Sequence, residues 1–255
     1  MTAPLHALDR GGDGLPVVLL HAFPLDHRMW DDVVALLPAD LRPIAVDLPG
    51  LGSPTVGEPS LERAVDGVLA LLDDLGLDRA VVAGLSTGGY VATMLAGRAP
   101  ERVAALALCD TTTVVGPPDE PDARQETARQ LEGALGIAAV MDSVSDGLGP
   151  HAGPELAGRV AQMIEGQVPG DVAWVCRALA VRPDTTEALR AHPGPVLLLF
   201  GEHDTPTPPE QRLPELQAVR PDATSVVVPG SGHLTALEQP AAVADALAEL
   251  AGRAS

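Results

Sequence analysis

Short runs of consecutive apolar residues alternate along the chain with segments in which apolar residues recur every three or four positions. The apolar runs have the length of strands that are buried on both faces, and they occupy residues 17–20, 43–46, 80–83, 103–108, 195–200 and 224–228. Segment 60–75 is of the second kind, because its apolar residues form one stripe along a helix. Strands and helices that alternate in this way predict an α/β fold, with a mostly parallel sheet covered by helices on both faces.

The alternation stops between about residues 112 and 192. In this region segments 121–135, 154–167 and 171–182 have helical patterns, Gly/Pro turns separate them, and no strand is readable. The alternation of strands and helices resumes at residue 195. We therefore predict a core domain made of residues 1–111 and 193–255, and a helical cap formed by the insertion 112–192.

The composition limits the classes of partner. The chain has 255 residues, with 16 Lys and Arg against 35 Asp and Glu, and its formal net charge is −19. This acidity argues against nucleic acid, which needs a basic face, and against an anionic membrane surface. The apolar runs are far shorter than the roughly 20 residues of a membrane-spanning helix, and no secretory signal is readable at the N-terminus. We expect a cytoplasmic protein with a small-molecule ligand; the sequence leaves a homo-oligomer open.

Ser86 is the strongest candidate for chemistry, in the sequence Gly84-Leu85-Ser86-Thr87-Gly88. This G-x-S-x-G pattern follows the predicted strand 80–83 and opens a predicted helix over 86–97, as a sharp strand-to-helix turn requires. The two glycines relieve crowding at the turn, and the N-terminus of the helix favours a developing negative charge. The alternative is a serine that caps a helix in a glycine-rich turn; the flanking strand and helix favour a nucleophile.

His233 and Asp204 are the candidate base and acid, because a serine hydroxyl needs a base within hydrogen-bond reach. His233 ends a Gly-Ser-Gly-His sequence just past strand 224–228, and Asp204 ends a Gly-Glu-His-Asp sequence just past strand 195–200. The carboxyl ends of parallel strands converge on one crevice, so both side chains are expected beside Ser86. Asp110 follows strand 103–108 in the same way and is the rival acid, but the chain order Ser, Asp, His favours Asp204.

The backbone N–H groups of Phe23 and Thr87 are the predicted oxyanion hole. Phe23 lies in a His-Ala-Phe-Pro sequence after strand 17–20, and Thr87 follows the candidate nucleophile. Such donors meet charge that grows in the transition state, and the loss of one lowers the rate by about 10²–10³. His21 is interpreted as a structural residue that braces this loop. No cluster of His, Cys and carboxylate residues has metal-ligand spacing, so we predict no metal site.

Together these motifs resemble the α/β-hydrolase superfamily over nearly the whole chain. The resemblance rests on residues 21–24, 47–52, 84–89, 201–204 and 230–233. Within the superfamily the chain is similar to small lid-bearing serine hydrolases, which include oxoadipate enol-lactonases, bacterial carboxylesterases and cofactor-free haloperoxidase-like perhydrolases. The resemblance implies a triad of Ser86, Asp204 and His233, and neither a metal nor an organic cofactor. The chain departs from the usual pattern at Ala22, where glycine is usual, and at Thr87, where methionine is common.

We expect an enzyme that cleaves a carboxylic ester, a lactone or a related acyl compound through an acyl-enzyme on Ser86. A perhydrolase-like or haloperoxidase-like activity without a cofactor is one alternative. A ligand-binding protein without catalysis on the same fold is the other, because function depends on the site and not on the fold.

The insertion is expected to form the lid and the substrate pocket. Trp174 and Met163 are candidate lining residues, although helix packing is the favoured role of both. A substrate that carries a carboxylate needs a local arginine to offset the acidity of the protein. The sequence does not rank the candidates, which are Arg28, Arg124, Arg129, Arg159, Arg177 and Arg182.

Overall fold

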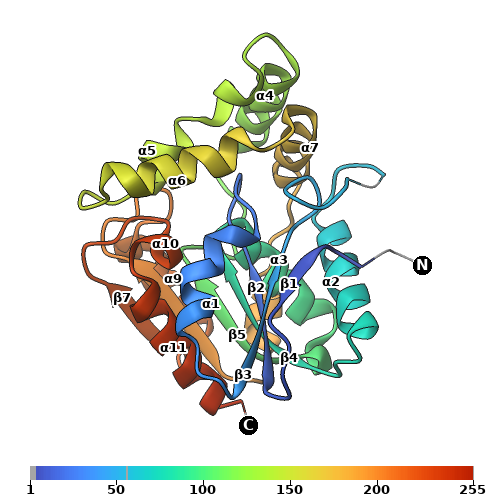
Figure 1. Ribbon diagram of the computed structural model, residues 1–255, viewed down its shortest axis with the longest axis vertical. Helices are drawn as coiled ribbons and strands as arrows, with labels where there is room; N and C mark the ends of the chain where they lie inside the picture. The colour runs from blue at the N-terminus through green and yellow to red at the C-terminus, as the bar shows by residue number, and fades with distance from the viewer. Residues whose placement is uncertain (1–3, 56, 255) are drawn as a thin grey trace.

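A computed structural model describes residues 4–55 and 57–254 of the chain. Within these residues seven strands form one sheet in the order β1-β3-β2-β4-β5-β6-β7 (Figure 1). The strands are β1 (Ala7–Asp9), β2 (Leu15–Leu20), β3 (Leu41–Val46), β4 (Ala80–Leu85), β5 (Val103–Cys109), β6 (Val196–Gly201) and β7 (Thr224–Val228). All neighbouring strands are parallel except β1, which pairs antiparallel with β3.

The mostly parallel sheet confirms the α/β fold predicted from the apolar pattern, and only β1 was missed. β1 has three residues, none of them fully buried, so it carries no apolar run. It lies at the edge of the sheet, where pairing with the backbone of β3 positions it. The central strands, in contrast, are apolar because both of their faces are covered.

Helices cover both faces of the sheet (Figure 1). Helices α1 (Asp31–Leu36) and α11 (Pro240–Gly252) pack against each other on one face. Helices α2 (Glu62–Asp74) and α3 (Thr87–Arg98) cover the other face, where α3 contacts β2, β4 and β5. The helical stripe predicted in segment 60–75 is the buried side of α2. The remaining helical elements of the core are η1 (His27–Trp30), η2 (Pro100–Arg102), α9 (Pro209–Val219) and α10 (Thr235–Glu238).

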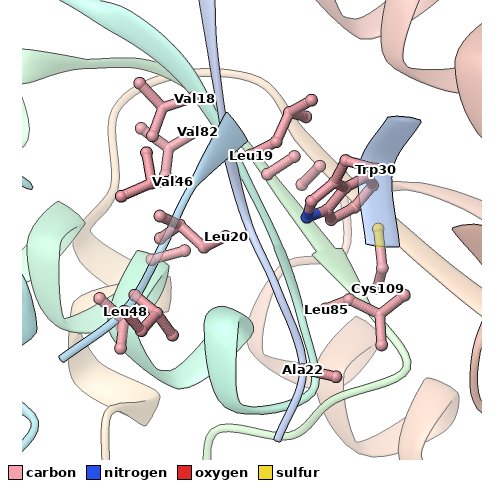
Figure 2. Close-up of a cluster of buried hydrophobic side chains, with 14 of the residues drawn as sticks. Val18, Leu19, Leu20, Ala22, Trp30, Val46, Leu48, Val82, Leu85 and Cys109 are labelled. Carbon is pink, nitrogen blue, oxygen red and sulfur yellow. The ribbon is translucent and has the colours of Figure 1, made fainter. Parts of the chain in front are cut away.

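The hydrophobic core lies between the sheet and these helices. Figure 2 shows Val18, Leu19 and Leu20 of β2 beside Val82 of β4 and Val46 of β3. All five side chains are fully buried. Burial of one such side chain stabilises the fold by about 1.5–3 kcal/mol, so the central strands hold a rigid frame for the residues at their carboxyl ends.

The predicted helical insertion follows β5 and lies beyond the carboxyl edge of the sheet (Figure 1). Its elements are α4 (Glu120–Glu132), η3 (Gly136–Val140), α5 (Ser143–Gly147), α6 (Pro154–Glu165), α7 (Pro169–Ala180) and α8 (Thr186–Ala191). Helix α4 packs along α7, whereas α8 packs against α3 of the core. At that contact a Cβ on Gly97 would lie 2.7 Å from the Cβ of Ala188, so glycine permits the close approach. None of the helices in the described part of the chain is long and apolar enough to cross a membrane.

His192, just after α8, is buried without a polar partner. The residue is 3% exposed, and neither ring nitrogen has a hydrogen-bond partner among the described residues. Burial of the ring and the positive charge of Arg220 lower the pKa of His192 to about 4. The ring is therefore neutral in the folded protein at neutral pH.

We predict that His192 destabilises the protein in acid. The unfolded chain binds this proton near pH 6.5, whereas the folded chain binds it near pH 4, so acidification between these values favours unfolding. Between pH 7.5 and pH 5 the free energy of unfolding of His192→Leu should fall by about 2 kcal/mol less than that of the wild type. Denaturant titrations at both pH values measure this difference, and equal pH dependence in the two proteins would contradict the prediction.

Candidate active site

Ser86 stands on a sharp turn between β4 and α3. Its backbone angles are φ 53° and ψ −112°, and the only other non-glycine residue with positive φ in the described part of the chain is Asp110. Such a conformation costs on the order of 1–3 kcal/mol and persists only where the surroundings enforce it. Here the Ser86 N–H donates to the Cys109 carbonyl at 2.9 Å, and the Thr111 hydroxyl donates to the Ser86 carbonyl at 2.8 Å.

The two glycines of the turn allow the backbone to pack closely. A Cβ on Gly84 would lie 2.1 Å from the carbonyl oxygen of Gly88. A Cβ on Gly88 would lie 2.1 Å from the carbonyl oxygen of Leu20 at the end of β2. Neither position has room for a side chain, which is the physical reason for the G-x-S-x-G spacing.

His233 and Asp204 meet in the loops that follow β7 and β6. The Nδ1 atom of His233 lies 2.9 Å from Oδ1 of Asp204, and both residues are buried. Asp204 is itself held by Thr207, whose N–H donates to Oδ1 at 2.9 Å and whose hydroxyl donates to Oδ2. In the tautomer in which Nδ1 donates to Asp204, Nε2 of His233 is the nitrogen left to exchange a proton with a reacting group.

Asp110, the rival acid, makes different contacts. Its Oδ1 accepts from the Gly201 N–H at 2.7 Å, and its Oδ2 accepts from the Thr235 hydroxyl at 2.5 Å. Burial, together with the negative charge of Asp204, raises the pKa of Asp110 well above its usual value. Asp110 thus links the ends of β5 and β6 to α10, and within the described residues it makes no hydrogen bond to His233.

The predicted oxyanion hole consists of the backbone N–H groups of Phe23 and Thr87. Both residues line the same cavity as Ser86. The backbone N–H groups of Phe23 and Thr87 form no hydrogen bond to any described residue, so both donors are available to a ligand. His21 supports the Phe23 loop: its Nδ1 donates to the Ala22 carbonyl at 2.9 Å, and its Nε2 accepts from the Leu48 N–H at 3.0 Å.

The cavity has a volume of about 320 Å³, which suits a small organic ligand. Ser86, Thr87 and His233 line its core side, and Val160 and Ile164 of α6 line the side of the insertion. Trp174 and Met163, which the sequence offered as lining candidates, do not line this cavity. Trp174 instead donates from Nε1 to the Gly57 carbonyl at 3.0 Å, and Met163 is buried within the hydrophobic core.

One group of potential metal ligands lies elsewhere. In the described residues His6, His27 and Asp47 bring ligand atoms within 4.8 Å of one another. Both imidazoles are hydrogen-bonded to the Asp47 carboxylate through Nδ1, and none of the three residues lines the cavity. Their sequence spacing gives no metal signature, because three separate segments carry them.

Comparison with known proteins places the chain in a family. A sequence model of the α/β hydrolase family matches residues 17–246, and the chain belongs to that family. It is a hydrolase. The carboxylesterase YbfK of Bacillus subtilis is 27% identical over 253 residues, and the match covers 92% of this chain and 80% of YbfK.

Solved structures agree with this assignment. A thermophilic esterase from Thermogutta terrifontis, described with malate bound, has 34% identity and a TM-score of 0.92, with 98% of this chain and 93% of that chain covered. The enol-lactonase from Burkholderia xenovorans has 25% identity and a TM-score of 0.85, with 96% and 95% covered.

The contacts of Asp204 generate a prediction about the acid of the triad. Asp204→Asn should lower kcat by about 10⁴, because an amide favours the wrong tautomer of the histidine. Asp110→Asn, the matched control, should retain most of kcat, since Asp110 contacts Gly201 and Thr235 instead. Steady-state kinetics on an activated ester measures both values. The opposite pattern, with Asp110→Asn inactive and Asp204→Asn active, would make the assignment wrong.

A second prediction concerns metals. If Ser86, Asp204 and His233 supply a nucleophile, an orienting acid and a base, ester turnover should be unchanged after dialysis against a chelator. His6→Ala, which removes one of the three potential ligands outside the cavity, should be equally active. Loss of turnover in the chelator, with recovery on addition of zinc, would contradict this prediction.

Proposed function

We propose that this α/β hydrolase cleaves a carboxylic ester, a lactone or a related acyl compound through an acyl-enzyme on Ser86. The observation that carries the proposal is the meeting of the strained Ser86 turn with the His233–Asp204 pair at one small cavity. The relatives support the substrate class, since YbfK and the Thermogutta protein are named esterases and the Burkholderia protein is named an enol-lactonase.

The chemistry runs in two steps. Ser86 Oγ attacks the carbonyl carbon while Nε2 of His233 takes the hydroxyl proton, and the N–H groups of Phe23 and Thr87 hold the oxyanion. The intermediate collapses to an acyl-enzyme, and His233 returns the proton to the departing alcohol oxygen. Water then attacks the acyl carbon while Nε2 of His233 takes a proton from it. The bond between Ser86 Oγ and the acyl carbon breaks, His233 returns the proton to Oγ, and the carboxylic acid leaves. Asp204 keeps the proton on Nδ1 and stabilises the imidazolium in both steps.

The insertion 112–192 acts as the cap in this proposal. Helix α6 places Val160 and Ile164 at the cavity, and α4 contributes Glu120 and Arg124. Substrate choice is therefore assigned to the helices of the insertion, and bond cleavage to the core residues at the carboxyl ends of the strands. A protein that only binds ligands would need neither the strained serine turn nor the histidine–carboxylate pair.

We also propose the partner that the sequence predicts, together with a location and a state of assembly. The partner is a small acyl compound, which the cavity volume of about 320 Å³ accommodates. The net charge of −19 disfavours a nucleic acid or an anionic membrane as partner. We expect a cytoplasmic location, and the sequence is compatible with either a monomer or a homo-oligomer.

The proposed mechanism predicts a burst and strongly non-additive losses. An activated nitrophenyl ester should release a first equivalent of nitrophenolate per active site faster than the later turnovers, provided that deacylation is slower. Ser86→Ala should abolish the burst and lower kcat by about 10⁶. His233→Ala should cost about as much, and the double variant little more, because the residues act as a unit.

Stopped-flow and steady-state assays on the four proteins test this directly. Circular dichroism provides the control for folding of each variant. A folded Ser86→Ala protein with wild-type ester turnover would contradict the mechanism, and so would losses in the double variant that multiply.

A further inference from the structure

The side chains that line the cavity include more basic than acidic groups, unlike the chain as a whole. The chain carries 35 acidic against 16 basic residues. The cavity, however, is lined by three arginines, Arg124, Arg182 and Arg212, against two carboxylates, Glu120 and Asp146. Arginines gathered in this way beside a reactive serine lower the electrostatic cost of bringing an anion into an acidic protein.

We propose that Arg124 binds a free carboxylate of the substrate, so that this hydrolase prefers esters or lactones that also carry a carboxylate. The inference rests on the proposed ester or lactone hydrolysis and narrows its substrate class. It separates Arg124 from the other arginines by what each guanidinium contacts. Arg212, the third lining arginine, donates from Nη1 to Oε2 of Glu215 at 2.9 Å.

Four of the six arginines considered from the sequence lie outside the cavity lining and have carboxylate partners there. The pairs are Arg28–Asp26, Arg129–Glu126, Arg159–Asp32 and Arg177–Glu132. The positive charges of these four arginines are therefore neutralised by carboxylates outside the cavity. Only Arg124 and Arg182 of the six line the cavity.

Arg182 is committed to the protein itself. It is buried, its Nη1 donates to the Val114 carbonyl at 2.7 Å, and its Nη2 donates to Oε2 of Glu120 at 3.0 Å. Its guanidinium also lies 4.4 Å from the centre of the Tyr90 ring. Arg182 therefore holds Glu120 in place and adds positive charge, and it differs from Arg124 in being buried and hydrogen-bonded to the protein through both of its Nη atoms.

Arg124 keeps its donors. Its Nη2 lies 3.5 Å from Oε1 of Glu120, and this distance is longer than a normal hydrogen bond. The side chain of Arg124 forms no hydrogen bond to any described residue. Glu120 is shared between Arg124 and Arg182, so this group of three side chains retains one positive charge. The side chain of Arg124 is 32% exposed, which leaves the guanidinium accessible from the cavity that it lines.

The position of Arg124 links this charge to the reacting centre. Its guanidinium lies 5.7 Å from the centre of the Phe23 ring, and the Phe23 N–H is a proposed oxyanion donor. A substrate whose carbonyl sits at Ser86 thus has a guanidinium within the same small cavity. The planar fork of arginine matches a carboxylate in a bidentate pair, and lysine cannot reproduce this geometry.

Two esters that differ in one charge test the proposal. Mono-4-nitrophenyl glutarate carries a free carboxylate, whereas 4-nitrophenyl methyl glutarate is its neutral methyl ester, and nitrophenolate release reports on both. The wild type should prefer the anionic ester. In Arg124→Gln the ratio of kcat/KM for the anionic ester to that for the neutral ester should fall by about 10- to 100-fold, mainly through KM, as expected for loss of a charge-assisted pair.

Two further variants separate recognition from a general effect of charge. Arg129→Gln removes an arginine from the same helix that pairs with Glu126 outside the cavity, and the ratio should change less than twofold. Arg124→Lys keeps the charge but loses the fork, and its ratio should lie between those of the wild type and Arg124→Gln.

The outcomes distinguish this inference from the proposed function. If both esters are hydrolysed by way of Ser86 and Arg124→Gln leaves the ratio unchanged, the carboxylate site is wrong while the proposed function stands. If neither ester acylates Ser86, the proposed function fails, and calorimetry with glutarate decides the inference alone. Glutarate binding that is at least tenfold weaker in Arg124→Gln than in the wild type supports the site; equal or absent binding overturns it.

Discussion

The backbone turn at Ser86 packs directly against the ends of β2 and β5, and the rest of the site depends on this contact. The Ser86 N–H reaches the Cys109 carbonyl, and Gly88 lies so close to the Leu20 carbonyl that no side chain fits between them. A positive φ at a serine is unfavourable by itself and is maintained because the neighbouring strands leave the chain no relaxed alternative. The position of Ser86 is thus set by the packing of the central sheet.

The same sheet arranges the other polar groups by their strand ends. The loop after β6 carries Asp204 and the loop after β7 carries His233, so the two side chains meet beyond adjacent parallel strands. Asp110 follows β5 but is drawn to Gly201 and Thr235, and burial together with the charge of Asp204 raises its pKa. Of these two buried acids, Asp204 is the one that contacts the histidine.

Local electrostatics at the cavity do not follow from the net charge. Most arginines of the chain are neutralised by nearby carboxylates, as Arg159 is by Asp32. At the cavity two arginines share the single carboxylate of Glu120, and this shortage of acid leaves a positive group in a protein of net charge −19. The substrate class inferred from Arg124 therefore depends on which helices of the insertion face the core.

The sequence by itself determined the elements whose causes are local. Continuous apolar runs identified six of the seven strands in the described residues, and the G-x-S-x-G spacing located the turn of Ser86, because burial and backbone crowding act on adjacent residues. Topology then predicted that the loops carrying Asp204 and His233 would converge. The tertiary structure decided the rest: the edge strand β1, the return of α8 to the core, the contacts of Asp110, the grouping of His6, His27 and Asp47, and the arginine that keeps its donors. Each of these depends on side chains or backbone groups that are distant in sequence, and periodicity along the chain carries no information about such pairs.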